Sequence, residues 1–151
     1  MAKAANRQAV EGNQMTELPE NSTRYFNREL SWLAFNRRVM EEATNPAHPL
    51  LERLRFLSIS GSNFDEFFMV RVAGLMGQQL QKVEARSADG LTPGQQLAAI
   101  SAEAEMLADN QQAVWTAIRA DLAETGIHVL DADAIEGETE AWLEGHFRDQ
   151  I

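Results

Sequence analysis

The residues best suited to binding chemistry lie within residues 50–75, in the segment LLERLRFLSISGSNFDEFFMVRVAGL. Its apolar residues have helical spacing, but a polar break at Gly61-Ser62-Asn63 interrupts them and is followed by Asp65-Glu66. A helix that stops at this break and begins again with Asn63 would expose unpaired backbone N–H groups. Helix ends of this kind bind anions, and phosphate is the usual one. The segment therefore predicts an anion-binding helix end at Asn63.

Two interpretations of Asn63 remain open. In the structural one, Asn63 is an N-cap and Glu66 completes a capping box, worth about 1 kcal/mol of stability. In the functional one, the Asn63 amide and the free N–H groups of the next turn bind a phosphate group. The carboxylates of Asp65 and Glu66 count against a bare phosphate because they already complement the helix dipole. A bound magnesium ion or a nearby arginine would resolve that conflict. The residues alone favour the cap.

The neighbouring arginines and aromatic residues allow similar alternatives. Arg71 lies eight residues after Asn63, about two helical turns or ~12 Å further on and on roughly the same face. It is expected to pair with Asp65 or Glu66, or to join an anion site. Four other arginines alternate with acids and predict surface ion pairs: Arg37, Arg38, Arg53 and Arg55. The nearby aromatic residues predict a core, although an adenine could stack on an exposed member: Trp32, Phe35, Phe56, Phe64, Phe67 and Phe68.

No catalytic constellation is evident. His48, His128 and His146 are scattered, and the patterns HExxH and GxxxxGK[ST] do not occur. There is no cysteine, which excludes disulfides, thiolate metal sites and a cysteine nucleophile. Adjacent acids such as Glu41-Glu42 diverge on a helix and make no acid–base dyad. We therefore expect no catalytic residue and no metal site in this chain, which is not a complete enzyme.

The charge distribution disfavours nucleic-acid binding. The formal net charge is -10, and residues 103–151 hold twelve acidic residues against two basic ones. Residues 24–71 are near neutral, with seven basic and six acidic residues. No basic stripe exists to neutralise a series of phosphates. There is no apolar run of the ~20 residues that a membrane span needs, and residues 1–22 lack the apolar core of a signal peptide. We expect a cytoplasmic protein, with peripheral membrane association left open.

The periodicity predicts an all-α domain, a helical bundle or hairpin with one long helix at about 92–125. A first helix follows Asn27 as its N-cap and ends near Asn45-Pro46. A second begins after Pro49 and reaches the polar break. Thr92-Pro93 is a strong helix start, and Thr125-Gly126 a matching stop. The long helix has apolar residues in alternating steps of three and four, with Gln111 in one core-like position, and should pack against the helix that begins near Asn63.

The ends of the chain predict different structure. Residues 1–22 are polar and predict a disordered leader. Residues 23–126 form the helical domain. Residues 127–130, Ile-His-Val-Leu, predict a short strand, and a helix follows from Glu138 to Ile151. Residues 127–151 therefore look like the truncated start of an α+β domain.

Two segments carry a family resemblance: RYFNRELSWLAFNRRVMEEA at 24–43 and PLLERLRFLSISGSNFDEFFMVRVAGL at 49–75. They contain the patterns ELSWLxFNxRVxEEA and PLxERxxFLxIxxxNxDEFxxxRVA, which are long and include specific polar residues. The chain resembles the N-terminal domain of the polyphosphate kinases that use a phosphohistidine to build long-chain polyphosphate from ATP. The resemblance covers about a third of the chain. One departure is Phe64, where leucine is expected.

This resemblance implies functions that the residues alone do not. It implies that Asn63, the asparagine of the NxDEF motif, contacts ATP. The phosphorylated histidine and the ligands of Mg²⁺ and phosphate would lie on domains absent here, with residues 127–151 as the start of the head domain. The implied partners are ATP, ADP, polyphosphate, the remaining domains and further subunits of a homo-oligomer. The alternative is a non-catalytic oligomerisation or interaction module in which Asn63 is only a cap.

Overall fold

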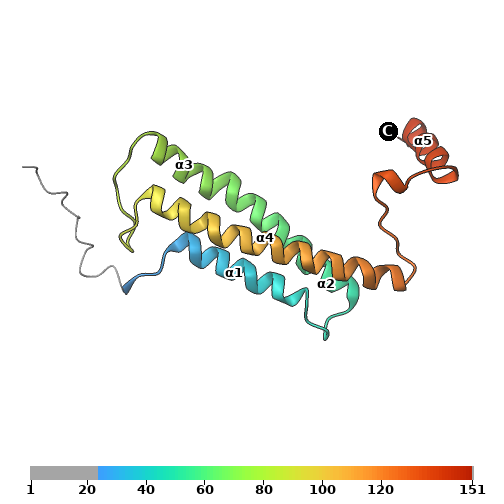
Figure 1. Ribbon diagram of the computed structural model, residues 1–151, viewed down its shortest axis with the longest axis horizontal. Helices are drawn as coiled ribbons and strands as arrows, with labels where there is room; N and C mark the ends of the chain where they lie inside the picture. The colour runs from blue at the N-terminus through green and yellow to red at the C-terminus, as the bar shows by residue number, and fades with distance from the viewer. Residues whose placement is uncertain (1–23, 151) are drawn as a thin grey trace, which may run out of the picture.

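The structure, a computed structural model, describes residues 24–150. The N-terminal leader predicted for residues 1–22 lies outside this range. The described chain forms the following helices: α1 (Arg28–Glu42), α2 (Leu50–Phe67), the π-helical turn η2 (Phe68–Val72), α3 (Ala73–Leu80), α4 (Pro93–Glu124), the 3₁₀ turn η3 (Ala132–Ala134) and α5 (Glu138–Gln150). Helices α1 to α4 lie side by side in an elongated bundle (Figure 1). The predicted helical domain is confirmed.

Helix α1 begins as its sequence predicts. The side chain of Asn27 accepts hydrogen bonds at 3.0 Å from the backbone N–H groups of Glu29 and Leu30, which satisfies two of the helix's unpaired donors. The helix ends at Glu42 with Ala43 as its C-cap, and Asn45-Pro46 lies in the loop that follows. Helix α2 then begins immediately after Pro49.

The polar break at Gly61-Ser62-Asn63 does not end the helix, so this prediction was wrong. Helix α2 runs through these residues and continues without interruption into η2 and α3. Asn63 and Glu66 are therefore interior positions, and neither an N-cap, a capping box nor an anion-binding helix end exists between residues 50 and 80. An interior glycine costs only about 1 kcal/mol relative to alanine. Burial of the Phe67 side chain, which is 1% exposed, offsets that cost.

One irregularity remains in this long helical segment. At η2 the backbone N–H of Ala73 donates to the carbonyl of Phe68, five residues back, which widens one turn. Such π-helical turns are rare and often occur beside functional sites. This turn lies between Phe67 and Ala73 and carries Arg71.

Helix α4 is the long helix predicted from residue 92. Thr92 and Gln95 form a reciprocal capping box, with Pro93 in the first turn. The helix ends where Gly126 adopts a positive φ of 83°, a conformation that glycine adopts without steric cost. The N–H of Ile127 then donates to the carbonyl of Leu122 at 3.0 Å, which closes the helix end.

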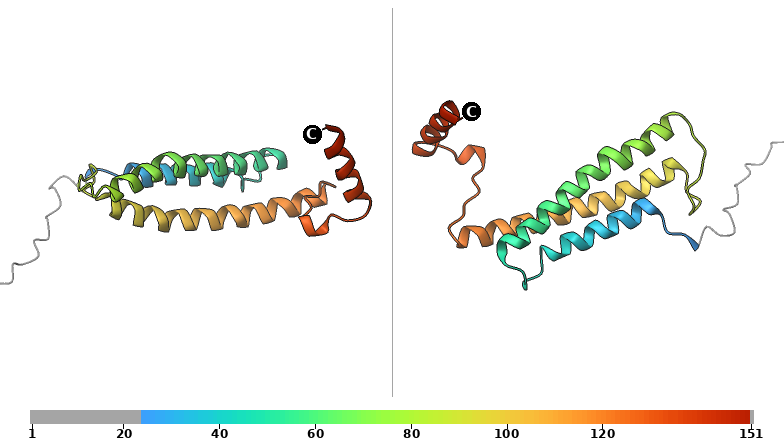
Figure 2. Two further views of the ribbon diagram at one scale, coloured as in Figure 1. Left: turned by 90° about the horizontal axis from the view of Figure 1, so that it is seen from above. Right: turned by 180° about the vertical axis from the view of Figure 1, so that it is seen from behind.

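The core forms where α4 meets α1, α2 and α3 (Figure 2). The larger cluster contains seven buried side chains: Leu33, Met40, Phe67, Val72, Leu75, Ile100 and Leu107. A smaller cluster of Ala43, Ile118 and Leu122 lies nearer the end of α4. The expected packing of α4 against the segment around Asn63 is confirmed, and α1 completes the bundle.

The predicted strand at residues 127–130 is absent, because the structure has no strand among residues 24–150. These residues form an extended connection, and a strand needs a partner with which to exchange backbone hydrogen bonds. The helix predicted from Glu138 is confirmed as α5, which lies apart from the bundle (Figure 1). No helix among the described residues is long and apolar enough to cross a membrane.

The core assignment predicts a contrast between neighbours on α4. Leu107 is 1% exposed in the larger cluster, whereas Met106 is 49% exposed. Leu107→Ala should lower the free energy of unfolding by about 2–5 kcal/mol, because it removes buried methyl groups and leaves a cavity. Met106→Ala should change it by about 0.5 kcal/mol or less. Urea unfolding of both variants tests this, and equal losses would contradict the core assignment.

Candidate functional site

A buried polar network joins three helices at the middle of the bundle. Asn36 on α1 and Ser60 on α2 are each 0% exposed. The Asn36 Nδ2 donates to the Ser60 carbonyl oxygen at 3.0 Å, and the Gln111 Nε2 on α4 donates to the Ser60 Oγ at 2.8 Å. The Asn63 Nδ2 donates to the Asn36 Oδ1 at 3.2 Å. These bonds satisfy polar groups whose burial unpaired would cost roughly 1–3 kcal/mol each.

Asn63 lies between this network and a surface pocket of about 220 Å³. We call this the Asn63 pocket, and it is lined by Trp32, Phe35, Asn63, Glu66, Phe67, Val70 and Arg71. The residues come from α1, α2 and η2. Although the helix is continuous, it still presents Asn63 to a recess in the surface, so Asn63 remains a candidate contact residue.

The walls of the Asn63 pocket are mainly aromatic and apolar. The rings of Trp32 and Phe67 stack with centroids 4.7 Å apart and an interplanar angle of 12°. Phe35 is 48% exposed, so the predicted aromatic core has an accessible edge. Phe68 is also 38% exposed, while Phe67 is buried. Pockets with apolar walls and a few polar groups are typical of small-molecule sites.

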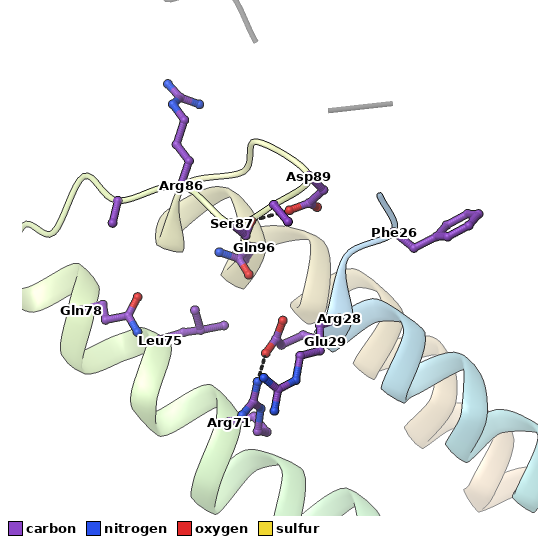
Figure 3. Close-up of a pocket in the computed structure, with 12 residues that line it drawn as sticks. Phe26, Arg28, Glu29, Arg71, Leu75, Gln78, Arg86, Ser87, Asp89 and Gln96 are labelled. Carbon is purple, nitrogen blue, oxygen red and sulfur yellow. Dashed lines mark hydrogen bonds and ion pairs between the residues drawn. The ribbon is translucent and has the colours of Figure 1, made fainter. Parts of the chain in front are cut away.

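Arg71 pairs with a residue that the sequence did not indicate. Its guanidinium bonds to the carboxylate of Glu29 on α1, and not to Asp65 or Glu66 as predicted (Figure 3). The widened turn at η2 changes which side chains share a helix face, and spacing based on a regular helix does not allow for it. Glu29 is 7% exposed, so its charge is compensated by this pair.

Arg71 also lines a second, larger recess of about 350 Å³ between the start of α1, α3 and the loop before α4 (Figure 3). Arg28, Glu29 and Gln96 lie in the same recess. Asn63 does not reach it. The Asn63 pocket is smaller, but it holds the residue that the sequence singled out and is therefore the candidate site.

Three of the four predicted arginine ion pairs are present. Arg37 bonds to Glu103 across α1 and α4, Arg53 to Asp121 at 2.9 Å, and Arg55 to Glu52 at 3.7 Å. Arg38 instead lies over the ring of Phe35 at 6.0 Å from its centroid. These pairs hold helices together or lie on the surface.

Two carboxyl groups have lowered pKa values. Glu42 lies at the end of α1, and Asp131 lies in the connection after α4. A hydrogen bond from His48 at 2.8 Å, helped by Asn45, lowers the pKa of Glu42. The hydrogen-bonded Arg119 similarly lowers the pKa of Asp131. These contacts lie in the α1–α2 loop and the connection after α4, and none of the residues involved lines the Asn63 pocket. Residues 24–150 contain no group of three or more His, Asp or Glu side chains arranged to hold a metal ion.

The sequence did not indicate the hydrogen-bond network to which Asn63 belongs. Asn36 falls within the apolar periodicity of α1, and Ser60 precedes the polar break. Gln111 is polar in a core-like position of the long helix, which is the one signal in the sequence for an internal hydrogen bond. Together these residues define a helical module that presents one amide to a mainly aromatic pocket.

Comparison with known proteins identifies the family. The family described as "Polyphosphate kinase N-terminal domain" matches residues 25–130. A polyphosphate kinase of Erythrobacter litoralis is 51% identical over 142 residues, which cover 94% of this chain and 20% of that protein. One of Mycobacterium avium is 48% identical over 139 residues, 91% of this chain and 19% of that protein. The chain belongs to the polyphosphate kinase family, to its N-terminal domain. No solved structure matches it significantly.

The chain spans about a fifth of the length of these relatives. The match continues past the helical bundle to residue 130, so it includes the closed end of α4 and the start of the connection. The similarity is to a part of each relative.

The ion pair between Arg71 and Glu29 predicts a measurable asymmetry among the arginines. Arg71→Leu leaves the buried Glu29 carboxylate unpaired and should lower the free energy of unfolding by about 1–3 kcal/mol. Arg55, whose side chain is 71% exposed, is the control. Arg55→Leu should change stability by about 0.5 kcal/mol or less, because exposed pairs contribute little. Chemical denaturation of both variants tests this, and an Arg55 effect as large as that of Arg71 would contradict it.

Proposed function

We propose that this chain is the nucleotide-contacting N-terminal domain of a polyphosphate kinase, in which Asn63 contacts ATP. The carrying observation is that Asn63 lies in a continuous helix, is held by Asn36 and lines an aromatic pocket open to the surface. The names of the relatives support ATP and polyphosphate as the substrates of the full-length protein.

In the proposed reaction the full-length enzyme transfers the terminal phosphoryl group of ATP to a histidine and then to polyphosphate, reversibly. Positioning and charge neutralisation dominate phosphoryl transfer, and metal ions supply much of the latter. We assign the phosphohistidine and the Mg²⁺ ligands to domains outside this chain. The domain described here would supply one wall of the nucleotide site.

We propose that the chain divides into two parts near residue 126. Residues 23–126 would form the helical domain, and residues 127–151 the start of the head domain. The side chains of α5 include none that is buried among the described residues, and Trp142 and Phe147 are 64% and 63% exposed. Exposed aromatic residues on a short helix support the proposal that this segment packs against further protein.

A second function, subunit contact, is favoured by one surface. Four large apolar side chains are more than half exposed along η2 and α3: Met69, Val70, Met76 and Leu80. A row of this kind suits an interface with another domain or subunit of a homo-oligomer. Val70 also lines the Asn63 pocket, so the two surfaces adjoin at η2, whereas Met76 and Leu80 on α3 lie outside that pocket.

The proposed role of Asn63 predicts a kinetic effect in the full-length enzyme. Asn63→Ala should lower kcat/KM for ATP by about 5–20-fold, as expected for loss of one hydrogen bond to the substrate. Ser62→Ala, an exposed neighbour, is the matched control and should leave it within about twofold. Circular dichroism establishes that both variants are folded. An unchanged Michaelis constant and turnover in Asn63→Ala would reject the role.

The isolated chain is expected to be inactive. Residues 1–151 incubated with ATP and Mg²⁺ should form no polyphosphate, because the phosphorylated histidine lies elsewhere in the proposed mechanism. Chromatographic analysis of radiolabelled product measures this, with the full-length enzyme as the positive control. ATP-dependent polyphosphate synthesis by the fragment would contradict the proposed division of labour.

A further inference from the structure

A second recess lies at the end of the bundle where α1 and α4 begin, the end opposite α5 (Figure 1). It has a volume of about 350 Å³, and Asn63 is not among the residues that line it. Three of its lining residues are arginines from separate segments: Arg28 on α1, Arg71 on η2 and Arg86 in the loop between α3 and α4. We call it the arginine recess. The sequence contains no basic stripe because only the fold brings these three positions together.

The two acidic residues of the arginine recess already have partners. The Glu29 carboxylate bonds to Arg71, and the Asp89 carboxylate accepts a hydrogen bond from the Ser87 hydroxyl. Glu29 is 7% exposed, so it lies beneath the recess with its charge balanced by Arg71. Three arginines against two acids leave the recess with a net positive charge, although the whole chain has a formal net charge of -10.

Two of the arginines have donors to spare. Arg28 is exposed, and within residues 24–150 its side chain makes no hydrogen bond or ion pair. Arg86 uses its Nη1 to donate to the Gly90 carbonyl oxygen at 2.7 Å, and its other N–H groups have no acceptor among the described residues. Figure 3 shows Arg28 beside the Arg71–Glu29 pair, with Arg86 extending from the loop above them. An anion at the mouth of the recess therefore meets two guanidinium groups that are free to bind it.

The chemistry of the arginine recess suits a phosphate-rich ligand and not a nucleoside. A guanidinium matches two phosphate oxygens with parallel N–H groups, which makes arginine a preferred phosphate contact. Helices α1 and α4 both begin at this end, and the partial positive charge of a helix N-terminus adds to that attraction. The one aromatic residue that lines the recess is Phe26, which is 92% exposed and points away from it in Figure 3. No ring among the lining residues is therefore in place to stack on a base.

We propose that the arginine recess binds a short run of phosphate units of inorganic polyphosphate, which Arg28 and Arg86 contact directly. The ion pair of Arg71 with Glu29 forms the floor beneath the bound chain. Residues 103–151, which include most of α4 and all of α5, hold twelve acidic residues against two basic ones and repel a polyanion. The inference rests on the proposed polyphosphate substrate of the full-length enzyme, and it adds a polyphosphate contact outside the Asn63 pocket.

The binding test uses residues 1–151, because every residue of the arginine recess belongs to this chain. Tripolyphosphate is titrated into the protein, and the side-chain Nε–H resonances of the arginines are followed by NMR. Tripolyphosphate should shift the resonances of Arg28 and Arg86 and bind at least about 10-fold more tightly than orthophosphate, because linked phosphates can engage both arginines at once. Equal affinity for orthophosphate, or shifts confined to other arginines, would overturn the inference. ATP that binds the same arginines as tightly as tripolyphosphate would assign the recess to the triphosphate of a nucleotide and would overturn it too.

Arg28→Gln should raise the Kd for tripolyphosphate by at least about fivefold, and Arg86→Gln by at least about threefold, because each loses a charge-assisted hydrogen bond. Arg55→Gln is the matched control, since it removes the same charge from an exposed side chain on α2. It should change the Kd by about twofold or less. An equal effect of Arg28→Gln and Arg55→Gln would show a general attraction by charge and would overturn the site.

Asp89→Asn tests the same site in the opposite direction. It removes a negative charge from the recess and keeps an oxygen that accepts from Ser87. The binding of tripolyphosphate should tighten by at least about twofold, a gain that partial unfolding does not produce. Unchanged or weaker binding would contradict the proposed contact.

In the full-length enzyme the readout is the reverse reaction, which uses polyphosphate and ADP. Arg28→Gln should raise the KM for polyphosphate by about 3–10-fold and leave the KM for ADP within about twofold. An unchanged KM for polyphosphate, or an equal rise in both constants, would overturn the role of the recess. The tripolyphosphate titration contains no nucleotide, so its failure would reject this site and leave the contact between Asn63 and ATP standing. Failure of Asn63→Ala to affect the use of ATP would have the opposite consequence.

Discussion

The structure depends on the requirement that polar groups buried between helices be fully hydrogen-bonded. Asn36 and Ser60 are both 0% exposed at the centre of the bundle, where an unpaired amide or hydroxyl would cost more than most single apolar contacts contribute. Their bonds tie α1 to α2, and Gln111 ties α4 to the same serine. A shift of any of these helices by one turn would break the network. It therefore fixes the register of the bundle together with the apolar packing.

The same constraint determines what the bundle can present at its surface. The Asn36 amide donates to the Ser60 carbonyl oxygen and accepts from Asn63. The Asn63 side chain is therefore held by a buried residue at the edge of the pocket that it lines. The π-helical turn that follows brings Arg71 to Glu29, which neutralises a buried carboxylate next to that pocket. The candidate site thus follows from the hydrogen bonds that pair the buried polar groups of the core. It is built on helices and does not depend on a loop.

The sequence predicted most of the fold because helix starts and stops are local. Asn27, Thr92-Pro93 and Gly126 act through their own backbone neighbours, and the structure confirms each of them. The predicted break at residues 61–63 was wrong because a glycine and a serine can lie inside a helix whose other side chains, such as Phe67, pack into the core. The predicted strand at residues 127–130 was wrong because a strand forms only where a second strand exchanges backbone hydrogen bonds with it. Asn63 could be singled out from its motif, but its amide orientation depends on Asn36, which is distant in sequence.

The central claim is that Asn63, held by Asn36, contacts the ATP of a full-length polyphosphate kinase. A crystal structure of the full-length enzyme with a non-hydrolysable ATP analogue tests it most directly. The account predicts a polar atom of the nucleotide about 2.7–3.2 Å from the Asn63 side chain, with the Asn63 Nδ2 still bonded to Asn36. A nucleotide bound away from the Asn63 pocket would contradict it.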